Sequence, residues 1–202
     1  MIVLGIDPGL HECAYAIVKY DSGVFCLEKV YMVRGSKGLK QSKAAVDMAD
    51  SIMFHNHDLD PSTSDKFFAV NSVVIEDQEI TYTTSQGARI QDIRCLSLVT
   101  GALLAKYHDQ RLIFPKPAEW KGQIPKEIHH ERIAKKLNIE TIVEYNKKGT
   151  VIPTTEEIER DVFGAENINP GDWYHLWDAA GLAIYGIEQL LIEERTNGLL
   201  LS

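Results

Sequence analysis

The first 33 residues contain three apolar stretches separated by short polar turns, and this pattern constrains the fold more than any other feature of the sequence. The stretches cover residues 2–6, 14–18 and 24–33. Asp21-Ser22-Gly23, between the second and the third, is typical of a β-hairpin. Consecutive strands joined by short turns predict an antiparallel meander.

Helical and strand-like patterns alternate through the rest of the chain. Helices are expected over residues 41–55, 85–107, 125–137 and 173–194, and short buried strands over 72–77 and 111–114. Helical crossovers favour parallel pairing of the strands that they connect. The sequence therefore predicts a single α/β domain over residues 1–202, in which three antiparallel strands are followed by parallel strands and helices flank the mixed sheet.

Two of the predicted strands end on acidic residues. Asp7 follows residues 2–6 and precedes Pro8-Gly9, and Glu76 follows a short buried strand. Parallel pairing would bring the two carboxylates together at one edge of the sheet, where such folds place their sites. Asp7 also suits a tight turn, since Asp-Pro-Gly sequences often form one.

The last predicted helix begins with further candidate ligands. His175 and Asp178 are three residues apart and share one face of its first turn, and Asp172 lies just before them. Each has an ordinary structural interpretation as well. Asp172 suits an N-cap, Asp178 complements the helix dipole, and His175 is a polar neighbour of Trp177.

Acidic residues from two strand ends and one helix start form a cluster that is costly unless cations compensate it. Carboxylate oxygens suit Mg²⁺ or Mn²⁺. Two such ions about 4 Å apart can activate a water and stabilise the leaving oxygen in phosphodiester hydrolysis. The cysteines, Cys13, Cys26 and Cys95, form no CxxC pair, and no nucleotide-binding loop or serine triad is evident. A nuclease site is the interpretation that these residues favour.

The segments GIDPG, VVIED and HLWDAAGLAIYG, with QGARIQDIRCLSLVTGALLAKY, resemble the RuvC family of Holliday junction resolvases in the ribonuclease H-like superfamily. Their order and spacing match over about residues 1–192. The resemblance implies a ribonuclease H-like fold and an endonuclease that resolves four-way and other branched DNA. It also implies that Asp7, Glu76 and Asp178 are metal-binding catalytic acids, with His175 at a catalytic position that holds an acid or a histidine in the family.

The chain departs from a typical bacterial member in two ways. It carries extra residues around 140–172, which leaves Asp172 as either a fourth metal ligand or only a helix cap. Its net charge is -8. These features, with PKPAEWKGQIPKE, suggest a phage or viral variant.

Local positive charge must offset this net charge if DNA binds. The candidate DNA-binding residues are Lys37, Lys40, Lys43, Arg89, Arg94, Lys116, Lys121 and Lys126. They also suit ordinary solvated faces. Tyr82 is suited either to stacking on an unpaired base or to packing on the sheet. His129-His130 is expected to mark an exposed helical turn rather than a metal site.

Because a four-way junction has two-fold symmetry, paired incision calls for a homodimer. Ser97, Gly101 and Ala105 recur every four residues, either as a dimer contact or as a face that packs on the sheet. No signal peptide or membrane span is apparent, and the few cysteines suit reduced thiols in the cytoplasm, that of an infected cell if the protein is viral.

Other functions also fit the sequence. One is a ribonuclease H-like nuclease for RNA–DNA hybrids or for DNA made during genome packaging, and another is a non-catalytic DNA-binding scaffold. An actin-like kinase is disfavoured, since a second phosphate loop is missing.

Overall fold

A computed structural model describes residues 1–9, 11–35, 41–57, 70–77, 86–139, 143–145, 151–153 and 173–200. The strands of the main sheet are β1 (Ile2–Asp7), β2 (Glu12–Asp21), β3 (Val24–Arg34), β4 (Ser72–Ile75) and β5 (Leu112–Ile113). The described helices are α1 (Gln41–His57), α2 (Gln86–Lys106), α3 (Pro117–Trp120), α4 (Lys126–Lys136) and α6 (Trp173–Leu200). A separate antiparallel pair comprises β6 (Val143–Tyr145) and β7 (Val151–Pro153).

The main sheet has the order β3-β2-β1-β4-β5. β1 pairs with β2, and β2 with β3, in antiparallel fashion, whereas β1 pairs with β4, and β4 with β5, in parallel. The predicted mixed sheet is therefore confirmed. The helical crossover after the meander makes β4 the parallel neighbour of β1, at the centre of the sheet.

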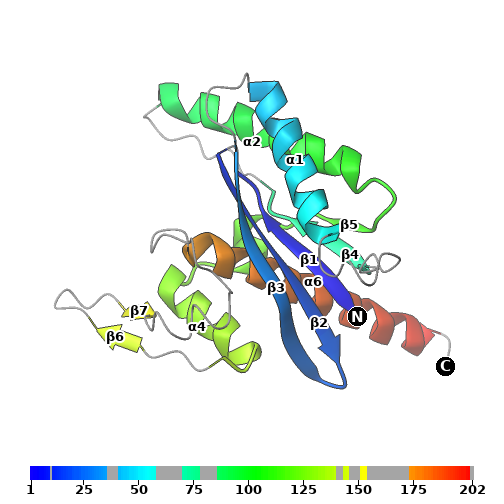
Figure 1. The fold of residues 1–202 in the computed structure, drawn as a ribbon. Coiled ribbons are helices and arrows are strands. Elements are labelled where there is room, and N and C mark those ends of the chain that lie inside the picture. The colour runs from blue at the N-terminus through cyan, green and yellow to red at the C-terminus, as the bar shows by residue number, and fades with distance from the viewer. Residues whose placement is uncertain are drawn as a thin grey trace.

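Helices cover both faces of this sheet, with α1 and α2 on one side and α4 and α6 on the other (Figure 1). Successive residues of a strand point to opposite faces. In β1, Val3 therefore packs against α6, while Leu4 and Ile6 pack under α1 and α2. Both faces of β1 and β2 are buried, which explains their nearly continuous apolar sequences.

The structure adds a short helix, α3, that the sequence pattern did not predict. α3 spans four residues, which is too short to show a helical period. Pro117 occupies its first turn, and the Glu119 carboxylate accepts a hydrogen bond from the backbone N–H of Lys116 at 2.8 Å. Proline early in a helix and an acid in the first turn are typical helix-starting features.

The structure also differs from the prediction at the end of the last helix and in the segment 140–172. α6 continues to Leu200, beyond the expected end at residue 194, because residues 195–200 contain no proline to end it. The segment 140–172, expected to be a polar insertion, contributes β6 and β7.

Ser97, Gly101 and Ala105 are exposed on α2. In the described part of the chain, no atom lies within 4 Å of the place that a side chain at Gly101 would take. This face therefore does not pack on the sheet, and its role as a dimer contact stays a prediction. Among the described residues, no helix is long and apolar enough to cross a membrane.

Candidate active site

Asp7 and Glu76 lie at the ends of neighbouring parallel strands. Ile6 is the partner of Ile75 in the β1–β4 register, and the backbone N–H of Glu76 donates to the carbonyl of Ile6 at 3.3 Å. Both acids are buried, with 9% and 8% of their surface exposed. Burial and the negative charge of Asp7 raise the pKa of Glu76, against the opposing effect of Lys121. The expected meeting of the two strand ends is confirmed.

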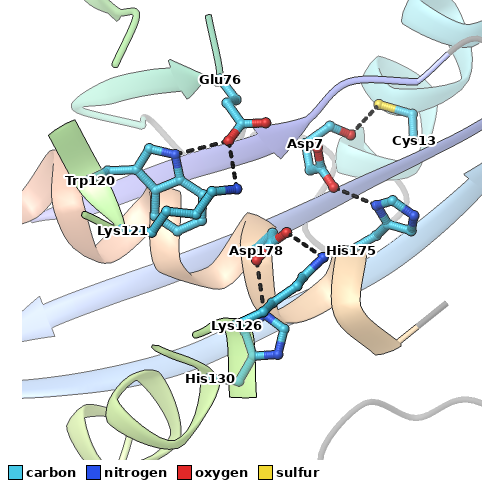
Figure 2. Close-up of polar contacts among 9 residues, drawn as sticks. All are labelled: Asp7, Cys13, Glu76, Trp120, Lys121, Lys126, His130, His175 and Asp178. Atoms are coloured by element: carbon cyan, nitrogen blue, oxygen red, sulfur yellow. Dashed lines mark hydrogen bonds and ion pairs between the residues drawn. The ribbon is translucent and has the colours of Figure 1, made fainter. Parts of the chain in front are cut away.

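Close contact between α6 and β1 brings the third acid to the same place. A Cβ atom at Gly5 would lie 2.1 Å from the carbonyl oxygen of Ala179 and 2.5 Å from the backbone nitrogen of Ala183. The absence of a side chain at Gly5 thus lets the helix backbone touch the strand. Asp178 precedes Ala179 and is 5% exposed. Its charge acts on His175, which lies beside it in the site (Figure 2).

His175, one helical turn before Asp178, contacts Asp7 directly. Its Nδ1 lies 2.6 Å from Oδ2 of Asp7 (Figure 2). This hydrogen bond raises the pKa of His175, because it outweighs the opposing effect of burial. The structure thus brings together the four residues Asp7, Glu76, His175 and Asp178, which the sequence analysis selected.

Cys13 supports the end of β1. Burial raises the pKa of its thiol to about 12, so the thiol is neutral at physiological pH. Its Sγ donates to the backbone carbonyl of Asp7 at 3.3 Å. This contact ties the backbone that carries Asp7 to β2.

Glu76 receives two donors from α3 and the turn after it. The indole Nε1–H of Trp120 and the ammonium of Lys121 both bind Oε1, at 3.1 Å and 3.0 Å. Oε2 of Glu76 makes no hydrogen bond or ion pair with any described residue. One oxygen of this carboxylate is thus occupied twice, and the other is left for a further partner.

Asp178 receives two donors from α4. Nε2 of His130 binds Oδ1 at 2.8 Å, and the ammonium of Lys126 lies 3.0 Å from Oδ2. Burial alone would raise the pKa of Asp178, but the hydrogen bond from His130 and the charges of Lys126 and Lys121 outweigh it and lower the pKa. Asp178 is therefore ionised at neutral pH, and His130 donates the shared proton.

The expectation that His129-His130 is exposed is wrong. His129 is 8% exposed and His130 1%, and His130 contacts a candidate catalytic acid. A signal for this was present in the sequence. His130, Ile133, Ala134 and Leu137 follow the i, i+3, i+4, i+7 spacing of a buried helix face.

Lys121 and Lys126 were expected to contact DNA phosphates, and in the structure both face the acids. Their ammonium groups give the cluster of three carboxylates part of its compensating charge (Figure 2). No group of three His, Cys, Asp or Glu side chains in the described ranges is arranged to hold a metal ion. The carboxylates meet ammonium, imidazole and indole donors instead.

The other DNA-binding candidates are placed as follows. Lys43 on α1, Arg94 on α2 and Lys116 before α3 are exposed. Arg89 lies in α2, but its side chain is outside the described part of the structure. Outside the described residues altogether are Lys37, Lys40, Tyr82 and Asp172.

No protein-family model matches the sequence, and no curated protein is significantly similar to it. Solved structures do share its fold. RuvC of Thermus thermophilus in complex with a Holliday junction substrate has a TM-score of 0.59 at 17% identity, and the match covers 91% of this chain and 90% of RuvC. The yeast mitochondrial Holliday junction resolvase Ydc2 has a TM-score of 0.55 at 10% identity, over 90% of this chain and 76% of Ydc2.

The fowlpox virus resolvase in complex with Holliday junction DNA has a TM-score of 0.50 at 14% identity, and the match covers 95% of this chain and 99% of the resolvase. At such low identity the similarity establishes the fold. The chain has the ribonuclease H-like fold of these resolvases, as the resemblance in sequence predicted.

Proposed function

We propose that this protein is a metal-dependent endonuclease that resolves four-way and other branched DNA by phosphodiester hydrolysis. The observation that carries the proposal is the convergence of Asp7, Glu76 and Asp178 from two strand ends and a helix. Buried carboxylates whose charges act on one another, as that of Asp7 acts on Glu76, are unfavourable unless cations accompany them. Such a cluster on a ribonuclease H-like fold suits the chemistry of a nuclease.

The chemistry of these ligands suits Mg²⁺ or Mn²⁺, and binding of an ion would require Lys121 and Lys126 to leave the acids. Carboxylate oxygens are hard ligands, and these three already attract cationic groups, since Lys121 and Lys126 pair with Glu76 and Asp178. Asp7, Glu76 and Asp178 would hold two ions, with Asp172 as a further candidate. When bound, the ions supply an activated water and stabilisation of the leaving oxygen.

The remaining roles belong to the chain itself. His175 holds Oδ2 of Asp7 through its Nδ1, and we assign it to the catalytic group with the three acids. Lys121 and Lys126 reach the same site on flexible side chains. If divalent cations were bound to the acids, these ammonium groups would be suited to contact the phosphates of DNA.

Branched DNA is the substrate class that we propose. Two proteins that share this fold are resolvases solved with Holliday junctions. Exposed Lys43, Arg94 and Lys116 could contribute phosphate contacts around the site. Two incisions in a two-fold symmetric junction need two sites, so the proposal includes a homodimer.

A substrate panel tests this function. The purified protein is offered a four-way junction, a flap, a linear duplex and an RNA–DNA hybrid in Mg²⁺ or Mn²⁺, with Asp7→Asn as the inactive control. Preferential paired incision of the junction is expected. Cleavage of the hybrid alone would redirect the proposal to a ribonuclease H activity, and cleavage by Asp7→Asn at the normal rate would remove the assigned site.

A further inference from the structure

Trp120 and His130 each donate a hydrogen bond from a buried ring to one of the candidate catalytic acids. The Trp120 indole binds Oε1 of Glu76 at 3.1 Å, and the His130 imidazole binds Oδ1 of Asp178 at 2.8 Å. Each of these acids also pairs with an ammonium, from Lys121 or Lys126 (Figure 2). All four donors come from the short segment 120–130.

We propose that Trp120 and His130 are positioning residues, which hold Glu76 and Asp178 in the orientation that binds divalent cations. This inference rests on the proposed function. In it, the two buried rings stay bound to the acids, whereas the two ammonium groups can leave them.

Burial distinguishes the two kinds of donor. The His130 side chain is 0% exposed, and the rings of Tyr174 and Trp177 lie 5.6 Å and 6.4 Å from it, centroid to centroid. Trp120 is 9% exposed. In contrast, the Lys126 side chain is 40% exposed and extends over the face of Tyr174. The rings cannot leave without disturbing the core, whereas the lysine can rotate into solvent.

The carboxylate oxygen that each donor binds is consistent with lasting ring donors and exchangeable ammonium donors. On Glu76 both donors share Oε1, so Oε2 is available to a cation while Trp120 stays in place. On Asp178 the imidazole binds Oδ1 and the exchangeable ammonium binds Oδ2. Hydrogen bonds that orient ligating carboxylates are a common requirement of metal sites, because they fix the direction of the free lone pairs.

Two substitutions of His130, by Gln and by Asn, test whether metal binding depends on a donor at the position of Nε2. Gln at position 130 can present its amide N–H near the place of Nε2, whereas Asn carries the same group on a side chain shorter by one methylene. Binding of Mn²⁺ is measured by titration calorimetry. We expect His130→Asn to lower the Mn²⁺ affinity by roughly 10–100-fold, and His130→Gln to retain most of it.

His129→Met is the matched control. His129 is the preceding residue on α4, is also buried, and has a pKa lowered to about 4, mainly by burial, so it is neutral at pH 7. Its Nε2 has no hydrogen-bond partner among the described residues. The replacement therefore perturbs the packing of α4 without removing a donor from an acid, and the Mn²⁺ affinity is expected to stay unchanged.

Thermal unfolding in chelator shows whether each variant is folded. A Mn²⁺ affinity of His130→Asn equal to that of the unaltered protein, or equal losses in the Asn and Gln variants, would overturn the inference. If His130→Asn does not fold, Trp120→Phe makes the same test at Glu76, since it keeps an aromatic ring and removes the N–H. Unchanged Mn²⁺ affinity in that variant would likewise overturn it.

A different result of the same titrations would contradict the proposed function itself. It would appear as absence of Mn²⁺ binding by the unaltered protein, or as binding that Asp7→Asn does not affect.

Discussion

Gly5 is the point at which β1 touches the backbone of α6, and Gly5→Ala is expected to disturb both the fold and the site. The added Cβ would meet the Ala179 oxygen at 2.1 Å, whereas real Cβ contacts are essentially never under 3.0 Å. Because both contacted atoms belong to the helix backbone, no side-chain rotation relieves the clash. The helix must retreat by about 0.9 Å.

Two effects of this substitution oppose each other. Overpacking of a core costs about 1–3 kcal/mol, while replacing Gly stabilises by about 0.4–1 kcal/mol through the unfolded chain. The cost of the clash is the larger of the two, so the free energy of unfolding should fall by about 1–2 kcal/mol. Since Asp178 adjoins Ala179, the shift also moves an acid relative to Asp7, and a misplacement near 1 Å can cost about 10²-fold in rate.

Urea denaturation in chelator measures the first effect, and junction cleavage in Mg²⁺ measures the second. Gly101→Ala is the matched control for the denaturation measurement, because Gly101 lies on the exposed face of α2 and no described atom lies within 4 Å of its missing Cβ. That change should stabilise the protein, by about 1 kcal/mol or less. A Gly5→Ala protein with unchanged unfolding and unchanged cleavage would refute the close contact on which the site geometry rests.

Further predictions concern the acids, their partners and the metal. The raised pKa of Glu76 means that the folded state favours its protonated form, so Glu76→Gln should stabilise the metal-free protein at pH 7, with a gain that shrinks as the pH falls towards the ordinary glutamate value. The lowered pKa of Asp178 has the opposite sign, so Asp178→Asn should destabilise the protein at pH 7, by an amount that disappears in acid. Urea denaturation across pH checks both, and equal signs would contradict the assigned environments. Asp7→Asn should abolish junction cleavage while gel-shift binding persists, and loss of binding would point to a structural role. Lys121→Ala with Lys126→Ala should weaken junction binding and flatten its salt dependence, so an unchanged salt slope would exclude them as phosphate contacts. Cleavage should require Mg²⁺ or Mn²⁺, and activity that survives thorough chelation would contradict the metal-dependent mechanism.

The positions of the strand-end acids were predictable because they follow from local pattern and connection rules. The meander before α1 and the helical crossover after it place β4 beside β1 in parallel. Once those strands pair, Asp7 and Glu76 must meet at their ends. His175 and Asp178 were predictable as neighbours because three residues separate them on one helix.

The partners of the acids were harder to predict, because they depend on how α3 and α4 pack against α6. Trp120 lies in a helix of four residues, which shows no period, and its indole reaches Glu76 across 44 positions of sequence. The prediction that His130 is exposed rested on the polarity of its side chain and on the adjacent His129. Its spacing to Ile133 and Leu137 favoured a buried face, but only the packed structure shows that this face meets Asp178.

The net charge of -8 gives no indication that lysines pair with the carboxylates of the site. Lys121 and Lys126 were selected as phosphate-binding residues, yet both pair with carboxylates in the structure. The two roles are compatible, since an ammonium on a long flexible chain can exchange one anionic partner for another. Divalent cations at the acids would remove the reason for these ion pairs just where the phosphate of a substrate needs positive charge. Under the proposed function, a lysine beside one of these acids can therefore stabilise its charge and, if a metal ion takes over that role, help to hold DNA.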